Sequence, residues 1–295
     1  MTDPTLSSSA RPPKPLPQRG SRAVNCNAYA QVIAHQLGLK EGELPSLLRD
    51  TGLPKEVMYS GSEIHMDGPQ LIQVINNALH MGKDPTIGLR CAADLRPSTH
   101  GPVGFLTNNA PDLYSALSML EEFGRLKPPF IHFKLDFDDR WLRCELHLDQ
   151  GISNDVQRVV LEAVTLAMQT NIESFIGGAF RQGHFMFAFD APSYEAAYTD
   201  YFHSPVSFAN DQNVLLIPAE FARRARSSSD PNAYVIAHNF CVELLEQIPD
   251  ASLDIVDRVR HLLLTHSVGS LTEEDVARAL FISKRTLARR LAVHG

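Results

Sequence analysis

The sequence predicts an α+β N-terminal domain, with helices and an antiparallel sheet, followed by an all-α domain at the C-terminal end. Three observations predict this class. Apolar residues alternate with period two in the middle of the chain, helical apolar spacing lies on both sides of that region, and only helical spacing follows residue 232. The 295 residues are enough for two domains that each bury a core.

The N-terminal segment and the absence of long apolar runs predict a cytoplasmic protein. Residues 1–22 contain five prolines among serines and basic residues, so we expect a disordered tail. No run approaches the roughly 18 apolar residues of a membrane helix, and no signal-peptide core is present. The four cysteines form no CxxC pair, which predicts reduced and mostly buried thiols.

Helical apolar spacing dominates the first third of the chain. It predicts helices at residues 25–37, 44–49, 69–81 and 85–95. The next apolar run, Val103–Leu106, predicts a strand. Residues 111–123 predict an amphipathic helix whose inward side chains are Leu113, Leu117 and Leu120.

The strongest local signal is a β-hairpin between Phe130 and Leu148. Both runs alternate apolar and polar residues around the polar turn Asp139–Arg140. A two-residue turn opposes Ile131 to Leu148, His132 to His147, Phe133 to Leu146, Lys134 to Glu145, Leu135 to Cys144, Asp136 to Arg143 and Phe137 to Leu142. The two pairs of opposite charge support this register.

A long helix and further strands complete the N-terminal domain. Residues 155–176 carry a broad apolar stripe, and Gly177 marks the end of that helix. Strands are expected at residues 184–189, 206–208 and 214–217, with a helix near 194–201. The segment Arg223–Asn232, which contains three consecutive serines, is the best linker in the chain.

The C-terminal end is helical and basic, whereas the rest of the chain is acidic. Helices are expected at residues 233–246, 253–266, 273–280 and 284–293. Residues 253–295 carry a net charge of +2, and the remainder carries −9. The total of −7 alone would argue against nucleic acid, but this distribution suits a protein that contacts DNA with one end only.

The segment Leu271–Leu291 has the pattern of two short helices joined by a tight turn. Thr272 and Asp275 can form a capping box on the first helix, and Ser283 can cap the second. Val276 and Leu280 face inward on the first helix.

The second helix of this pair has an apolar and a basic side. Leu287 and Leu291 form its buried side, so Arg285 and Arg289 point away from the core. A solvated basic helix in an ordinary helical bundle is the alternative interpretation. The agreement of caps, turn length and outward arginines favours a helix-turn-helix that enters the major groove.

The C-terminal residues VARALFISKRTLARRLAVHG resemble the first helix-turn-helix of AraC/XylS-type transcription regulators. The resemblance continues upstream in Gly101–Phe105, in the helix start Ala110–Leu113 and in the stretch from Ala191 to Asn213. These segments are similar to the arabinose-binding-type regulatory domain of one branch of that family. The resemblance covers the chain from about residue 23 to its end.

The resemblance implies both a DNA-binding face and an effector. It implies DNA contacts from Ser283, Lys284, Arg285, Thr286, Arg289 and Arg290. Family DNA-binding domains carry two helix-turn-helix units, so we expect a domain truncated after its first unit. The resemblance leaves the effector open: ornithine-like amino acids, fatty acids and other carboxylates are all compatible with it.

Other functional patterns are weak. His132 and His147 share a hairpin face, but two imidazoles without a third ligand do not indicate a metal site. Phosphate-loop, dinucleotide and serine-hydrolase motifs are lacking, so we expect no cofactor and no enzyme activity. One aromatic set can line an effector pocket, although core packing is its commoner fate. It comprises Phe185, Phe187, Phe189, Tyr194, Tyr198, Tyr201, Phe202 and Phe208.

We divide the chain into a tail (1–22), an effector-sensing and dimerisation domain (23–226), a linker and connecting helix (227–252) and an incomplete helix-turn-helix DNA-binding domain (253–295). The function that follows is a sequence-specific, effector-responsive transcription regulator. It would bind promoter DNA as a homodimer and contact RNA polymerase if it is an activator. The alternative is a protein–protein interaction module, or a truncated regulator that no longer binds DNA specifically.

Overall fold

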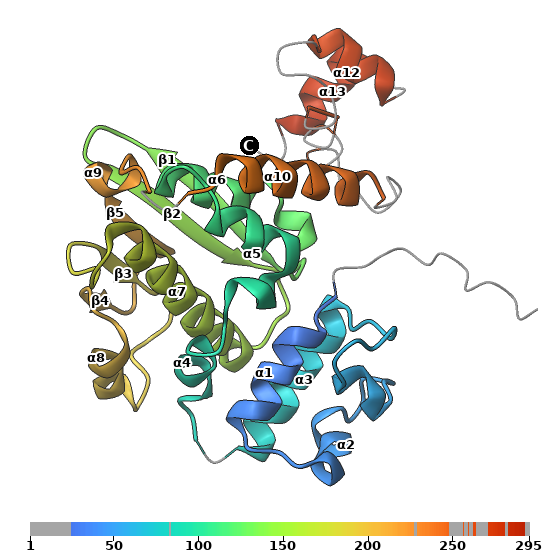
Figure 1. Ribbon diagram of the computed structural model, residues 1–295, viewed down its shortest axis with the longest axis vertical. Helices are drawn as coiled ribbons and strands as arrows, with labels where there is room; N and C mark the ends of the chain where they lie inside the picture. The colour runs from blue at the N-terminus through green and yellow to red at the C-terminus, as the bar shows by residue number, and fades with distance from the viewer. Residues whose placement is uncertain are drawn as a thin grey trace, which may run out of the picture.

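The computed structural model has the α+β architecture that the sequence predicts, with helices around a five-stranded sheet (Figure 1). The structure describes residues 25–82, 84–226, 229–247, 256, 259, 262–263, 271–280 and 283–292. The predicted tail, most of the predicted helix 253–266 and the turn at residues 281–282 lie outside the described residues.

The predicted N-terminal helices all form. They are α1 (Asn27–Gln36), α2 (Leu44–Leu47), α3 (Gly68–Met81) and α4 (Ile87–Ala92), with the 3₁₀ turns η1 (Glu41–Glu43) and η2 (Lys55–Met58) between α1 and α3. A capping box begins α3. The Asp67 carboxylate accepts a hydrogen bond from the Gln70 main-chain N–H at 2.9 Å, and the Gln70 side chain accepts one from Asp67 N–H at 3.0 Å.

The apolar run Val103–Leu106 lies in a helix, so the predicted strand is wrong. This helix, α5 (Gly101–Asn108), follows the 3₁₀ turn η3 (Pro97–His100). Pro102 lies in its first turn, where a missing N–H costs nothing. A four-residue apolar run is too short for its periodicity to distinguish a strand from a buried helix.

The predicted hairpin forms with each expected pair in register. β1 (Ile131–Phe137) and β2 (Trp141–Leu148) are antiparallel. The sheet continues from β2 to β5 (Asn213–Pro218), then β3 (His184–Met186) and β4 (Val206–Ser207), in the order β1-β2-β5-β3-β4. β3 and β4 are parallel, whereas the other neighbours are antiparallel.

The long predicted helix is α7 (Asn154–Ile176). The Ser153 side chain caps its start, and Gly177 ends it in the left-handed conformation with φ of 75°. Its inward side packs against α4 and α3. The amphipathic helix α6 (Leu113–Glu122), also predicted, is capped by the Asp112 side chain and is followed by the 3₁₀ turn η4 (Gly124–Leu126).

The predicted aromatic set forms core. Phe187 is 1% exposed, and its ring centroid lies 4.8 Å from that of Phe189 and 6.0 Å from that of Tyr198. Tyr198 lies on α8 (Tyr198–Tyr201), which follows the 3₁₀ turn η5 (Glu195–Ala197) in the predicted helical region. These rings pack against one another, so the set belongs to the core.

The predicted linker begins against the body of the protein. After α9 (Ala219–Ala222), Ala225 forms an isolated bridge with Asp112, and the Arg226 guanidinium donates to the main-chain oxygen of Asn108 at 2.5 Å. Residues 227–228 lie outside the described part of the chain. The helix that follows, α10 (Pro231–Glu246), runs across α5 and α6 (Figure 1).

A second small core joins α10 to α5 and α6. It consists of Val103, Leu106, Met119, Phe123, Ala237, Cys241 and Leu245. All four cysteines of the chain are buried and free, as predicted. Within the described ranges, we find no helix with the length and apolar character needed to cross a membrane.

Candidate nucleic-acid interface and candidate ligand cavity

The first helix of the predicted helix-turn-helix is α12 (Glu273–Ala279), and its predicted capping box is present. The Thr272 hydroxyl accepts from the Asp275 N–H at 3.2 Å, and the Asp275 carboxylate accepts from the Thr272 N–H at 3.0 Å. These bonds satisfy main-chain donors that the helix leaves unpaired. Val276 is buried, as predicted.

The second helix is α13 (Lys284–Leu291), and the predicted cap at Ser283 also forms. The Ser283 hydroxyl accepts from the Thr286 N–H at 3.1 Å. Leu287 is 1% exposed and packs with Val276, Ala277 and Leu280, so the two helices share a small core. This core fixes which side of α13 faces outward.

The outward side of α13 is basic. Lys284, Arg285 and Arg289 are exposed, and Thr286 is half-buried near the start of the helix. The Lys284 ammonium lies 3.0 Å from the Glu273 carboxylate of α12. The side chain of Arg290 lies outside the described residues. The arrangement presents cations and helix-start hydroxyls on one surface, as a major-groove helix requires.

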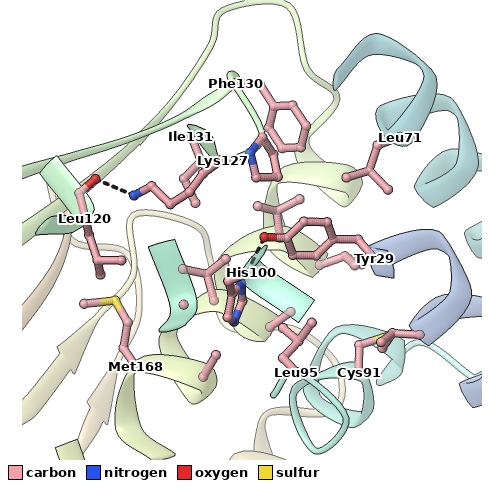
Figure 2. A pocket seen from close by; sticks show the side chains of 18 of the residues that line it. Tyr29, Leu71, Cys91, Leu95, His100, Leu120, Lys127, Phe130, Ile131 and Met168 are labelled. Carbon is pink, nitrogen blue, oxygen red and sulfur yellow. Dashed lines mark hydrogen bonds between the residues drawn. The ribbon is translucent and has the colours of Figure 1, made fainter. Parts of the chain in front are cut away.

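A second candidate site is an apolar cavity inside the N-terminal domain (Figure 2). Its volume is about 130 Å³, and residues from α1, α3, α5, α7 and β1 line it. Helix α7 contributes a row of small and branched side chains that includes Val160, Ala163 and Ala167. Leu71 of α3 and Ile131 of β1 also line the cavity.

The polar groups of this cavity are few and buried. The Tyr29 hydroxyl and His100 Nδ1 are 2.9 Å apart, and the Lys127 ammonium donates to the main-chain oxygen of Leu120 (Figure 2). Burial lowers the pKa of Lys127 to about 7. Burial, together with the charge of Lys127, lowers the pKa of His100 to about 4. The histidine is therefore neutral at pH 7.

No sequence pattern predicted this cavity. The predicted candidates for effector contact were the aromatic set around Phe187, and that set does not line the cavity. The available signal was a lysine inside an otherwise apolar segment, Leu126–Phe130, followed by two prolines. His132 and His147 do face each other, but each lies beside a carboxylate, and no cluster of three metal-ligating residues occurs among the described residues.

Comparisons with known proteins identify the family. Residues 42–225 match the model of the arabinose-binding domain of AraC transcription regulators, N-terminal. The chain is 23% identical over 263 residues to the ornithine utilization regulator of Pseudomonas aeruginosa, covering 85% of this chain and 77% of the relative.

A solved structure supports the fold. The transcriptional regulator CdpR from Pseudomonas aeruginosa aligns with a TM-score of 0.50 and 18% identity, over 79% of this chain and 81% of that one. The family match spans more than half of the residues. The chain therefore belongs to the AraC-type transcription regulators that carry an arabinose-binding-type N-terminal domain.

Proposed function

We propose that the protein binds promoter DNA in a sequence-specific manner and that a small effector changes this binding. The observation that carries the DNA-binding part is the outward side of α13, where Arg285 and Arg289 are exposed above a core that includes Leu287. Arginines on a helix of this orientation can bond to guanine edges in the major groove. Ser283 and Thr286 support the proposal, because hydroxyls at a helix start suit phosphate oxygens.

Selection from a random duplex pool tests DNA binding. The full chain should enrich one sequence motif at about 0.15 M salt, where non-specific contacts are already screened. The double variant Arg285→Ala/Arg289→Ala should enrich none.

Arg278→Ala is the matched control, because Arg278 is an exposed arginine of α12 that pairs with Asp275. This variant should keep the motif. A double variant that enriches the same motif as the wild type would refute the role of α13. An absence of enrichment by the wild-type chain would favour the alternative of an interaction module without specific DNA binding.

The cavity among α1, α3 and α7 is the effector site in this proposal. It is apolar with a few polar groups, which is the usual character of small-molecule sites. Ornithine is a poor fit, because none of the described residues that line the cavity is acidic and ornithine carries two ammonium groups. The ligand acts by binding one of two DNA-binding arrangements more tightly than the other.

We also propose a homodimer. The side chains of Val235, Ile236 and Phe240 lie on one side of α10 and are 54%, 68% and 49% exposed. Exposed apolar side chains grouped in this way are typical of contact surfaces. Sedimentation analysis should show a dimer for the wild type and a monomer for Ile236→Asp. A wild-type monomer at micromolar concentration would contradict the proposed homodimer.

The proposed location in the cell and the proposed contact with RNA polymerase follow from the family. A promoter-binding protein works in the bacterial cytoplasm, where the chromosome lies, and contacts RNA polymerase if it activates transcription. The regulator proposal requires no catalytic activity. Reporter transcription with and without the gene in the native host would test the direction of regulation.

A further inference from the structure

The inference concerns the chemistry of the effector, and it rests on the proposed effector role of the cavity. The buried side chain of Lys127 indicates the charge of the ligand. Lys127 is 5% exposed, and its ammonium lies 4.0 Å from the centroid of the Phe133 ring, which also lines the cavity. Among the described residues, the ammonium donates to a single acceptor, the main-chain oxygen of Leu120. An ammonium has three donors, so two are available to another partner.

A purely structural role for Lys127 is the competing explanation. Leu120 lies in the last turn of α6, and lysines often bond to the final carbonyls of a helix. Such lysines normally keep the ammonium in water, because burial of an unpaired charge is costly. Lys127 is instead buried at the cavity, where an ordinary capping residue would gain nothing from its charge.

The neighbouring groups make this corner of the cavity suited to an anion. His100 is neutral, and the Tyr29 hydroxyl bonds to it, so neither supplies a negative charge. The lining residues include no carboxylate, which leaves a cationic ligand without a counter-ion. They also include no second cation, so one negative charge matches the site better than the two of a phosphate monoester.

The volume limits the apolar part of the ligand. The cavity of about 130 Å³ is close to the roughly 150 Å³ of an apolar cavity that holds benzene. Branched and aromatic side chains such as Ile33, Ile75 and Phe130 surround this space. The body that fits is a benzene ring or a chain of about six carbons.

We propose that the cavity binds a compact monocarboxylate, whose carboxylate accepts hydrogen bonds from the Lys127 ammonium and whose apolar body lies between α3 and α7. The carboxylate supplies a negative charge inside the cavity, where none of the described lining residues carries one. The hydrocarbon fills space that water would leave empty, because most of the lining offers water no hydrogen bond.

The first test compares matched ligands on the full chain by calorimetry and thermal unfolding. Hexanoate and benzoate are the probes, and hexan-1-ol, benzyl alcohol and hexylamine are the same bodies without a negative charge. Each carboxylate should bind at least tenfold more tightly than its alcohol, and hexylamine and ornithine should not bind.

Variants of the cavity sharpen this test. Lys127→Met keeps the length of the side chain and removes the charge, so it should abolish the preference for carboxylates. Lys134→Met removes an exposed lysine of β1 and should leave the preference unchanged. Ala163→Leu fills the space without touching Lys127, and it should weaken every ligand at least tenfold even if Lys127→Met folds poorly.

Proton uptake gives a readout that a structural lysine would not show. A bound anion raises the pKa of Lys127 from about 7, so binding at pH 8 should take up part of a proton. Titrations in Tris and HEPES, which have different ionisation heats, measure this uptake. The other titratable groups whose charges interact with the lysine are His100, Cys144 and Glu121.

The outcomes separate this inference from the proposed function. Equal binding of acids and alcohols, or an unchanged preference in Lys127→Met, overturns the carboxylate assignment and leaves the cavity as the effector site. If no probe binds and Ala163→Leu changes nothing, the assignment of the cavity fails as well. The DNA selection experiment tests a separate part of the proposal, because it compares substitutions on α13.

Discussion

Gly88 on α4 leaves the space that the Glu162 carboxyl group on α7 occupies: a β-carbon at position 88 would lie 2.2 Å from Glu162 Oε2. It would also lie 2.9 Å from the Cα and from the main-chain oxygen of Val159, which cannot move aside easily. Gly88→Ala should therefore lower the free energy of unfolding by about 1–3 kcal/mol, despite the better helix propensity of alanine.

Urea denaturation measures this change. The control is Gly42→Ala, because a β-carbon at position 42 meets nothing within 4 Å. Gly42→Ala should change the unfolding midpoint little. If Gly88→Ala were as stable as the wild type, the close packing of α4 on α7 would be wrong.

Glu162 itself should make stability fall as pH rises. It is fully buried, and the hydroxyls of Tyr194 and Tyr198 donate to its Oε1 at 2.8 and 2.5 Å. Burial raises its pKa from 4.5 to about 7, and those two hydrogen bonds and the charge of Arg158 only partly oppose the rise. The folded protein therefore keeps a proton that the unfolded chain loses near its ordinary pKa.

The sign follows from that difference in bound protons. The contribution is fully present below pH 4.5 and is lost as the pH rises through about 7, with a total on the order of 3 kcal/mol. Glu162→Gln should remove this slope, which denaturant titrations of both proteins between pH 5 and pH 8 can measure. Parallel profiles for the two proteins would contradict an uncharged Glu162.

Glu273 should weaken DNA binding through Lys284. The two side chains are 3.0 Å apart and both are exposed, so the carboxylate competes with phosphate for the ammonium. Glu273→Gln should raise the affinity for DNA by about threefold to tenfold at low salt and steepen the salt dependence. Fluorescence anisotropy with a labelled duplex at several salt concentrations measures both quantities.

Glu274→Gln is the control for charge alone, because it removes one negative charge from the same helix. The charge of Glu274 acts on Lys284, but the described residues show no ion pair between the two. Its effect on DNA affinity should be smaller. Equal effects of the two variants would show that net charge matters and the contact does not.

Phe187 should be important for the stability of the fold and not for effector binding. Four aromatic rings surround it, and Phe187→Ala should cost about 3–5 kcal/mol in thermal or urea unfolding. Phe105→Ala removes a side chain that is 52% exposed and should cost far less. The milder Phe187→Leu should leave the stabilisation by hexanoate unchanged, and its loss would place the effector at the aromatic cluster.

Local patterns predicted much of the fold. The β1–β2 register follows from alternation and from facing charges such as Lys134 and Glu145, which depend only on neighbouring residues. The same locality explains the error at Val103–Leu106. In the structure Val103 and Leu106 pack with Ala237 and Cys241 of α10, which lie far away in the sequence, and no local pattern contains these contacts.

The two candidate sites also differ in how far local sequence patterns predict them. The faces and caps of α12 and α13 are periodic within one short segment, so the sequence predicts where Arg285 and Arg289 point. The cavity arises where several elements far apart in the sequence meet, among them α1, α3, α5, α7 and β1. The apolar neighbours of Lys127 in the sequence are a weak signal of burial, and only its contacts with the Leu120 oxygen and the Phe133 ring show that it is buried.

Helix α5 has two occupied sides, and this has a mechanical consequence. Gly104 and Thr107 line the cavity, while Val103 and Leu106 belong to the small core shared with α10. If the cavity is the effector site, a ligand that displaces α5 also displaces the side chains through which α5 packs against α10.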